Sequence, residues 1–194
     1  MRKERIESLT DLVFGLALSL TSIALILRAG ETIEDVFYSL FWFTFNFLLL
    51  ISMWFGYSRL LEHIDIESPA VLNLNVALLL LVSLEPYLFN LMVFGEAGDD
   101  MGVLLDVTST LYALCLGGIW LVLGALHHQA AKGGEQESML RMRNARLFDT
   151  AVFLLSAVPL SWEVDLLGIP IRFWMWFLSI PSGLILEAMS RIRR

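Results

Sequence analysis

The sequence predicts an all-α integral membrane protein with six transmembrane helices and both termini in the cytoplasm. Of its 194 residues, 57% are hydrophobic and only 17% are charged, whereas soluble domains have roughly 45–50% and about 25%. The charged residues cluster between apolar runs that are about as long as a bilayer is thick. Because this apolar excess is too large for a soluble core, the chain is expected to form one transmembrane domain, residues 1–194.

Six apolar stretches are long enough to be spans, since a helix needs about 20 mainly apolar residues to cross about 30 Å of hydrocarbon. Short connections with turn and charge signals separate most of them, and nothing remains for a soluble domain. The longest polar stretch, residues 127–146, is expected to be a loop or an extension of a helix into the cytoplasm. The predicted spans are residues 9–27, 36–61, 71–94, 101–126, 147–167 and 169–186.

Lysine and arginine residues set the predicted orientation, because positively charged connections are retained in the cytoplasm. Eleven of them fall on one side of the predicted spans, and only Arg28 and Arg172 fall on the other. Acidic residues collect on that other side, where they either attract cations or only keep the outer connections soluble. The eleven cytoplasmic residues are Arg2, Lys3, Arg5, Arg59, Lys132, Arg141, Arg143, Arg146, Arg191, Arg193 and Arg194.

Several classes of protein are excluded by composition and motifs. The net charge of −7 argues against a nucleic-acid partner, and the single cysteine, Cys115, excludes a disulfide scaffold. The motifs of serine hydrolases, zinc proteases and phosphate-binding loops are absent, so an enzyme is not expected. His63, Asp65 and Glu67 alternate as metal ligands can, but a solvated loop is the preferred interpretation. No cofactor or bound metal is therefore expected.

Polar side chains inside the predicted spans are candidate sites, because ionisable and amide groups are costly in hydrocarbon. Asp11 lies just inside the first span, where the free N–H groups of a helix start favour a carboxylate. Glu85 precedes Pro86 in the third span, where a structural glutamate and a cation site are both open interpretations. Aromatic clusters at residues 37–45 and 173–177 are interpreted as interfacial anchors. The polar set is Asp11, Asn46, Asn75, Glu85, Asn90, Asp106 and Asp149.

The segment before the first span carries a recognisable motif. Residues 5–11 read Arg-Ile-Glu-Ser-Leu-Thr-Asp and lead directly into an apolar helix. This segment resembles the Arg-x-x-x-Phe-Ser-Asp signature of the transmembrane protein 175 family of potassium channels. Arg5 and Asp11 match the signature, while Leu9 and Thr10 replace its phenylalanine and serine.

The resemblance continues into the second and third predicted spans. Trp54 with Tyr57 is similar to the family's Trp-x-x-His, with tyrosine in place of histidine. Residues 72–75 and 82–87 are similar to its asparagine-rich third span, which ends in Ser-x-x-Pro-Phe. In motif terms the similarity covers roughly the first half of the chain, and the second half matches only in topology.

The resemblance implies a homotetrameric, potassium-selective channel in the plasma membrane of a prokaryote, with the first helix of each subunit lining a central pore. The family's apolar constriction begins five residues after the signature aspartate, which places it at Leu16, Leu20 and Ile23. Ser19 matches a hydroxyl that follows the first constriction. The implied partners are further copies of the chain, membrane lipid and potassium as the permeant ion.

The spacing of these three residues is compatible with that role. Positions 16, 20 and 23 share one helical face, with Ser19 at its edge. A leucine stripe is ordinarily packing, so periodicity alone does not select it, whereas the resemblance does. Rings of such side chains offer an ion no oxygen and require partial dehydration. Because potassium holds its water less tightly than sodium, moderate selectivity is expected, and the same rings act as a gate.

The remaining signature residues are expected to fix the cytoplasmic ends of the helices. On this interpretation Arg5, Thr10 and Asp11 are not ion ligands, and Trp54 and Asn75 are their buried partners. Two alternatives stay open. One is a proton-coupled secondary transporter that titrates at Glu85, Asp106 or Asp149; the other is a non-conducting membrane scaffold.

Overall fold

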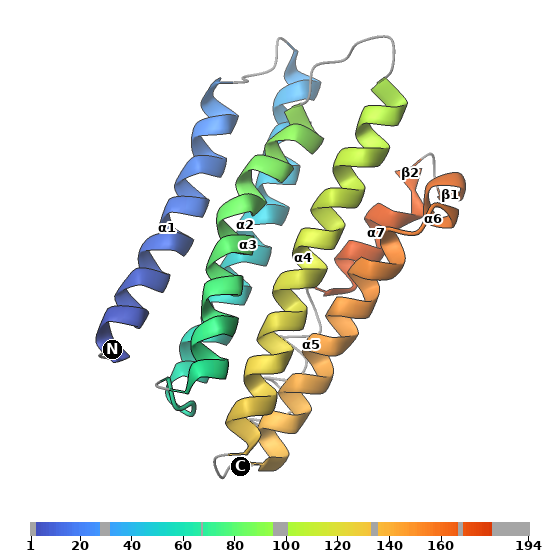
Figure 1. Ribbon diagram of the computed structural model, residues 1–194. Coiled ribbons are helices and arrows are strands. Elements are labelled where there is room, and N and C mark those ends of the chain that lie inside the picture. Colours follow the sequence, from blue (N-terminus) through green and yellow to red (C-terminus); the bar gives the residue numbers. More distant parts are fainter. Residues whose placement is uncertain are drawn as a thin grey trace, which may run out of the picture.

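Among the residues that the structure describes, five long helices form an elongated bundle, and two short helices and a small hairpin lie beside one end of the last long helix (Figure 1). The computed structural model describes residues 3–27, 32–66, 68–94, 101–132, 136–166 and 169–179. The elements are α1 (Lys3–Leu27), α2 (Ile33–Leu61), α3 (Pro69–Phe94), α4 (Met101–Ala131), α5 (Gln136–Ser156), α6 (Leu160–Glu163), β1 (Asp165–Leu166), β2 (Ile169–Pro170) and α7 (Ile171–Phe177).

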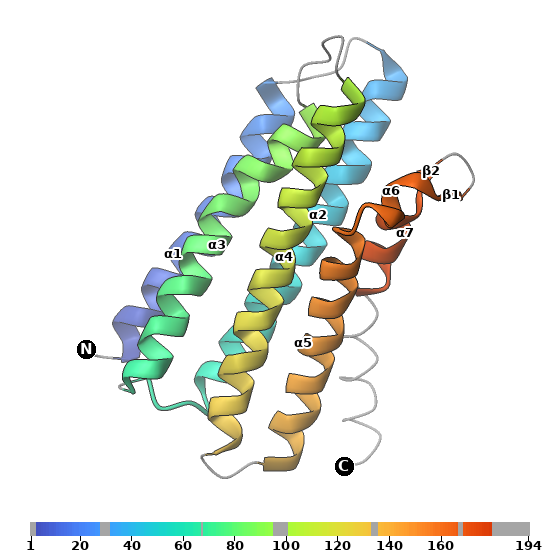
Figure 2. The ribbon, with the colours of Figure 1, turned by 45° about the vertical axis from the view of Figure 1, so that its right-hand side comes forward.

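The helix α1 lies at one edge of the bundle and packs against α2 and α3. At the other side α4 packs between α3 and α5, and α5 contacts α7. The start of α1, the end of α2, the start of α3 and the junction of α4 with α5 all lie at the same end of the bundle (Figure 2). We call it the basic end, because it carries Lys3, Arg5, Arg59, Lys132 and Arg143.

Within the described part of the chain, α1, α2, α3 and α4 are the helices long and apolar enough to cross a membrane. They coincide with the first four predicted spans, with extended bounds. The helix α1 begins at Lys3 and not at residue 9, because Ile6 and Thr10 already pack inside the bundle. The helix α2 is started by a capping box, in which Thr32 and Asp35 bond reciprocally to each other's backbone N–H at 3.1 and 3.2 Å.

The polar stretch at residues 127–146, expected as a loop or an extension of a helix, is mostly helical. The helix α4 runs on to Ala131, and α5 begins at Gln136. The fifth predicted span, 147–167, is therefore shifted toward the N-terminus, and its helix ends at Ser156.

The chain beyond Ser156 changes direction near Pro159, which has no backbone N–H to continue a helix. The hydroxyl of Ser161 donates to the Ser156 carbonyl at 2.7 Å and stabilises this turn. The strands β1 and β2 then pair antiparallel, in the registers Asp165 with Pro170 and Leu166 with Ile169. Of the sixth predicted span, 169–186, α7 occupies 171–177, and residues 180–186 lie outside the described residues.

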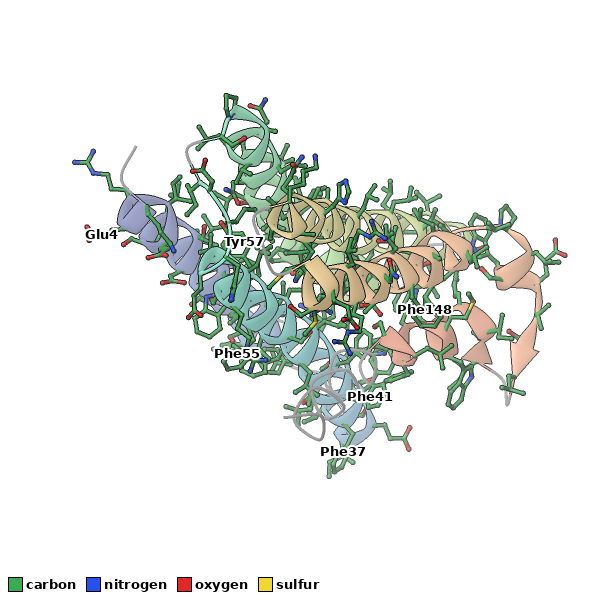
Figure 3. All side chains as sticks on the ribbon, turned by 90° about the horizontal axis from the view of Figure 1, so that it is seen from below. Glu4, Phe37, Phe41, Phe55, Tyr57 and Phe148 are labelled. Atoms are coloured by element: carbon green, nitrogen blue, oxygen red, sulfur yellow. The ribbon has the colours of Figure 1, made fainter. Side chains whose placement is uncertain are left out.

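Part of the aromatic set predicted as interfacial anchors forms a packed cluster inside the bundle. The Trp42 ring centroid lies 5.2 Å from Phe173 and 6.3 Å from Trp176. Trp176 is fully buried, and its ring lies tilted against that of Tyr112 with the centroids 5.3 Å apart. Its Nε1 donates to the Ser156 hydroxyl at 2.8 Å. Other rings do point away from the bundle, as Figure 3 shows for Phe37, Phe41, Phe55 and Phe148.

Candidate functional site

The helix α1 has two sharply different faces. One face packs against α2 and α3, and the opposite face is a stripe of large apolar side chains exposed on the single chain. We call this stripe the outward stripe. The buried face consists of Ile6, Thr10, Phe14, Ala17, Thr21 and Ala24. The outward stripe consists of Leu9, Leu12, Leu16, Leu20, Ile23 and Ile26.

The residues predicted to form a constriction lie together on the outward stripe. Leu16, Leu20 and Ile23 are 54%, 44% and 49% exposed, so none of them contributes to the core of the subunit. Ser19 is exposed beside them and donates from Oγ to the Gly15 carbonyl at 2.8 Å. This bond uses the hydroxyl proton and leaves the oxygen lone pairs available to a cation.

A polar junction joins α1 to α2 and α3 near the basic end. The Trp54 Nε1 donates to Asp11 Oδ1 at 2.8 Å, which ties α2 to α1. The Tyr57 hydroxyl donates to Asn75 Oδ1 at 2.7 Å, which ties α2 to α3, and both residues are buried. Thr10 is buried beside Tyr57 and donates to its own helix at the Ile6 carbonyl. We call this group the α1–α3 junction.

Two signature residues lie outside this junction. Arg5 is exposed and makes no ion pair with Asp11 within the subunit. Six residues of helix separate the two side chains, which turns them about 120° apart around the axis. Leu9 is 46% exposed and begins the outward stripe. The partner of Asp11 within the subunit is therefore Trp54.

A second polar cluster lies deeper in the bundle, where four helices meet. The Tyr112 hydroxyl donates to Asn46 Oδ1 at 2.7 Å, and Asn46 Nδ2 is 3.5 Å from the Thr21 hydroxyl. Glu85 is fully buried with Asn46 and Tyr112 as polar neighbours, and its carboxyl oxygens make no well-aligned hydrogen bond among the described residues. The sequence analysis identified Asn46 and Glu85. It missed the hydroxyl groups of Thr21 and Tyr112, which are also hydrogen-bonding groups inside apolar spans.

Two arginines that were counted as connection charges are buried in the bundle. The Arg146 guanidinium lies 3.4 Å from Asp149 and 4.5 Å from the centroid of the Trp120 ring. The Arg172 guanidinium donates to Asp106 at 2.6 Å and is only 2% exposed. The two aspartates that the sequence offered as titrating sites thus each lie against a cation.

Metal ligation was weighed at residues 63, 65 and 67, and Glu67 lies outside the described residues. Across the part of the chain that the structure describes, no three His, Cys, Asp or Glu side chains are grouped closely enough to hold a metal ion.

Long apolar helices with lipid-compatible outer faces and polar groups bonded inside define a multi-pass helical membrane protein. The family model for the endosomal/lysosomal potassium channel TMEM175 matches residues 5–86, from the signature arginine to Pro86. This match confirms, over these residues, the resemblance that the motifs of the first half predicted.

The fold is similar over its whole length to a known structure. That structure is the crystal structure of a lysosomal potassium-selective channel TMEM175 homolog from Chamaesiphon minutus, with a TM-score of 0.67 and 18% sequence identity. The match covers 98% of this chain and 97% of that chain. No curated protein sequence matches the chain. The family and the structural neighbour are ion channels, not enzymes.

Proposed function

We propose that the chain forms a homotetrameric, moderately potassium-selective channel, in which α1 from each subunit lines a central pore. The match of residues 5–86 to a potassium-channel family supports this function. The main observation for placing the pore at α1 is the outward stripe. It presents Leu16, Leu20 and Ile23 on one exposed face of a helix at the edge of the bundle. The pore constriction is formed by these three residues, with Ser19 beside them.

The packing of α1 supports its position at the axis. Its buried face is occupied by α2 and α3, so its outward stripe is available to other copies of the chain. The hydrogen bond between Trp54 and Asp11 sets the rotation of α1 about its own axis near the basic end. A fixed rotation keeps the same side chains at the axis in every subunit, which a narrow constriction requires.

The chemistry of the constriction follows from its composition. Four copies of each bulky apolar side chain narrow the path and give a passing ion no replacement for its water. Ions therefore pass partly dehydrated, and potassium is favoured because it loses water more readily than sodium. The outward lone pairs of four Ser19 hydroxyls offer partial compensation. Small changes in the ring diameter wet or dewet the path and so open or close it.

The proposed orientation places the basic end in the cytoplasm of a prokaryotic cell. Most of the lysine and arginine residues in the described part of the chain lie at this end. Arg146 and Arg172 are buried, so neither counts as a charge of a connection. Because Arg146 was assigned to the cytoplasmic side and Arg172 to the opposite side, leaving both out does not change the excess of positive charge on the cytoplasmic side. Both termini are then cytoplasmic and six spans cross the membrane.

A proton-coupled transporter fits the geometry less well. Asp106 and Asp149 lie against arginines, which favours structural roles for both carboxylates. Glu85 is fully buried within the bundle, so it faces no route along which a substrate would pass.

The test is ion flux through the purified full chain in liposomes. If a potassium gradient alone drives potassium flux, the chain is a channel. Flux that also requires a proton gradient indicates a proton-coupled transporter, and the absence of flux indicates a non-conducting scaffold. For a channel, we expect Leu16→Ala and Leu16→Asn to raise potassium flux and lower the potassium-to-sodium ratio on the order of threefold, or about 0.7 kcal/mol of barrier difference.

The matched control is Leu114→Ala. Leu114 is similarly exposed, at 45%, but lies on α4, far from the outward stripe. Its variant should conduct as the parent does. If both Leu16 variants keep the parental ion ratio, the constriction is not at Leu16.

A further inference from the structure

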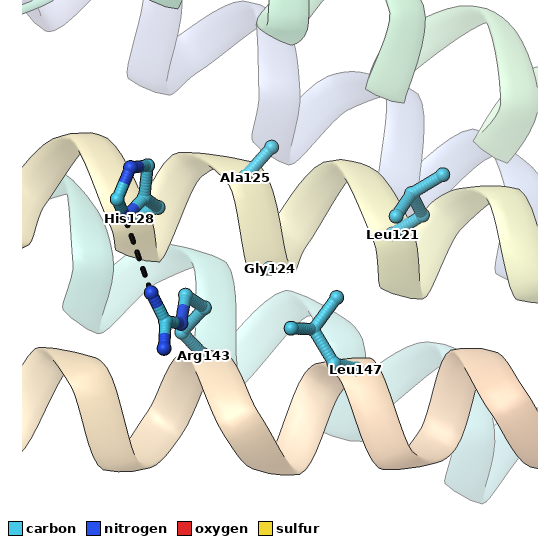
Figure 4. A pocket seen from close by; sticks show the side chains of 6 residues that line it. All are labelled: Leu121, Gly124, Ala125, His128, Arg143 and Leu147. Atoms are coloured by element: carbon cyan, nitrogen blue, oxygen red, sulfur yellow. Dashed lines mark hydrogen bonds between the residues drawn. The ribbon is translucent and has the colours of Figure 1, made fainter.

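A groove between α4 and α5 opens on the surface of the bundle near the basic end (Figure 4). Its volume is about 270 Å³. The lining residues on α4 follow the spacing i, i+3, i+4 and i+7, and those on α5 follow i and i+4, so each helix contributes one face. The lining consists of Leu121, Gly124, Ala125 and His128 from α4 and Arg143 and Leu147 from α5.

Gly124 keeps the floor of the groove open. A Cβ at this position would lie 3.5 Å from the Arg146 Cβ and 3.6 Å from Leu147 Cδ2. Any longer side chain would therefore fill the space between the two helices. The absence of a side chain at Gly124 therefore keeps the groove open.

The groove is apolar along its length and basic at one end. Leu121 and Leu147 are 48% and 41% exposed and form the apolar part. His128 and Arg143 close the end, with Arg143 Nη1 lying 3.4 Å from His128 Nδ1 (Figure 4). The distance along α4 from Leu121 to His128 is about 10 Å. This length suits the first part of a hydrocarbon chain below a polar group.

Arg143 carries a positive charge that no carboxylate neutralises among the described residues. Its guanidinium donates only to the side-chain oxygen of Asn144, at 2.8 and 3.1 Å, apart from its contact with His128. Arg141, two residues away, instead pairs with Glu137 at 3.6 Å and does not line the groove. The unneutralised charge is thus specific to the end of the groove.

We propose that this groove binds one anionic phospholipid. The phosphate lies against Arg143 and His128, and an acyl chain lies along Leu121, Ala125 and Leu147. An arginine fork matches two phosphate oxygens, and anionic lipids are attracted to basic residues at the membrane surface. A second copy of the chain fits less well, because parallel copies bring their basic ends to the same depth and oppose like charges. The proposal is independent of the pore and of ion conduction.

The test is lipid binding to the detergent-purified full chain, measured by native mass spectrometry. Phosphatidylglycerol and phosphatidylcholine with identical acyl chains are titrated separately. We expect phosphatidylglycerol to bind with a one-to-one step per subunit that Arg143→Gln weakens about tenfold, the loss of one strong charge-assisted contact. Arg141→Gln, which removes the same charge two residues away, should leave that step unchanged.

A second variant tests the acyl part of the site without changing any charge. Ala125→Phe fills the groove and should also remove the one-to-one step. Equal weakening by Arg143→Gln and Arg141→Gln would overturn the proposal in favour of a diffuse basic surface. Equal binding of the two lipids would also overturn it, as would full competition by glycerol phosphate, which has no acyl chain. Thermal melting of each variant confirms that it is folded.

Discussion

The two halves of the molecule place their polar residues in different ways. In the half formed by α1, α2 and α3, the contacts at the α1–α3 junction are single hydrogen bonds, such as Trp54 to Asp11 and Tyr57 to Asn75. In the half formed by α4, α5 and α7, the buried arginines of two ion pairs lie beside aromatic rings. Only 28% of the apolar window of α1 is buried within the chain, against 61% for α4.

This difference indicates that the two halves have different roles. An arginine–aspartate pair with a buried guanidinium is costly to break. The pair of Arg172 with Asp106 joins α7 to α4, and the pair of Arg146 with Asp149 lies within α5. Hydrogen bonds at the edge of a bundle hold a helix in place more weakly and leave its other face available. The family match ends at Pro86, so it covers the weakly held half that carries the outward stripe. The second half behaves as a scaffold against which the first half is positioned.

The largest expected effect is on the stability of the half formed by α4, α5 and α7. Arg146→Leu removes the cation beside the fully buried Asp149 and its contact with Trp120. We expect a loss of about 3–5 kcal/mol in the free energy of unfolding, measured by denaturant titration in mixed micelles. The double variant Arg146→Leu with Asp149→Leu should recover most of the loss. The potassium-to-sodium ratio of this double variant should equal that of the parent. A changed ratio would contradict the assignment of ion selectivity to the half formed by α1, α2 and α3.

A smaller loss of stability is expected at the α1–α3 junction. Tyr57→Phe removes the donor to Asn75, whose amide nitrogen already lacks a partner among the described residues. Leaving this buried amide unsatisfied should cost about 1–3 kcal/mol in the same titration. Tyr38→Phe, at a residue that is 52% exposed, is the control and should stay within about 0.5 kcal/mol.

The smallest loss of stability is expected for a variant of Trp54, although its effect on ion permeation should be clear. Trp54→Phe keeps a ring but removes the bond to Asp11, which is exposed, so the cost should be about 1 kcal/mol. Because this bond sets the rotation of α1, the ion ratio in liposome flux should change. A variant with unaltered flux would mean that the bond does not orient the pore helix.

The positions of the first four long helices were predictable from the sequence because their apolar windows are continuous. The start of α5 was not, since hydropathy treats the residues up to Arg146 as a connection, whereas in the fold Arg146 is buried against Asp149. The same limit applies to Arg172, whose partner Asp106 is 66 residues away. Charge pairing makes a polar segment suitable for burial, and a hydropathy average does not detect it.

The candidate site was predictable in its residues but only partly in its contacts. The motif placed Asp11, Trp54 and Asn75 in one region, where the structure has the junction. It did not indicate that Asp11 bonds to Trp54 and not to Arg5, because that choice depends on the angle between α1 and α2. The role of Leu16, Leu20 and Ile23 stays a prediction, since it concerns contacts between subunits.

Gly56 lies where the two halves of the molecule touch. A Cβ on Gly56 would come within 3.0 Å of an Arg146 guanidinium nitrogen, which is held by Asp149 and Trp120. A methyl group at Gly56 would require the guanidinium to move by a few tenths of an ångström, or α2 to move away from α5 by as much. The bare backbone of α2 at Gly56 therefore leaves room for the Arg146 guanidinium beside its partners, where the half that carries the outward stripe meets the other half.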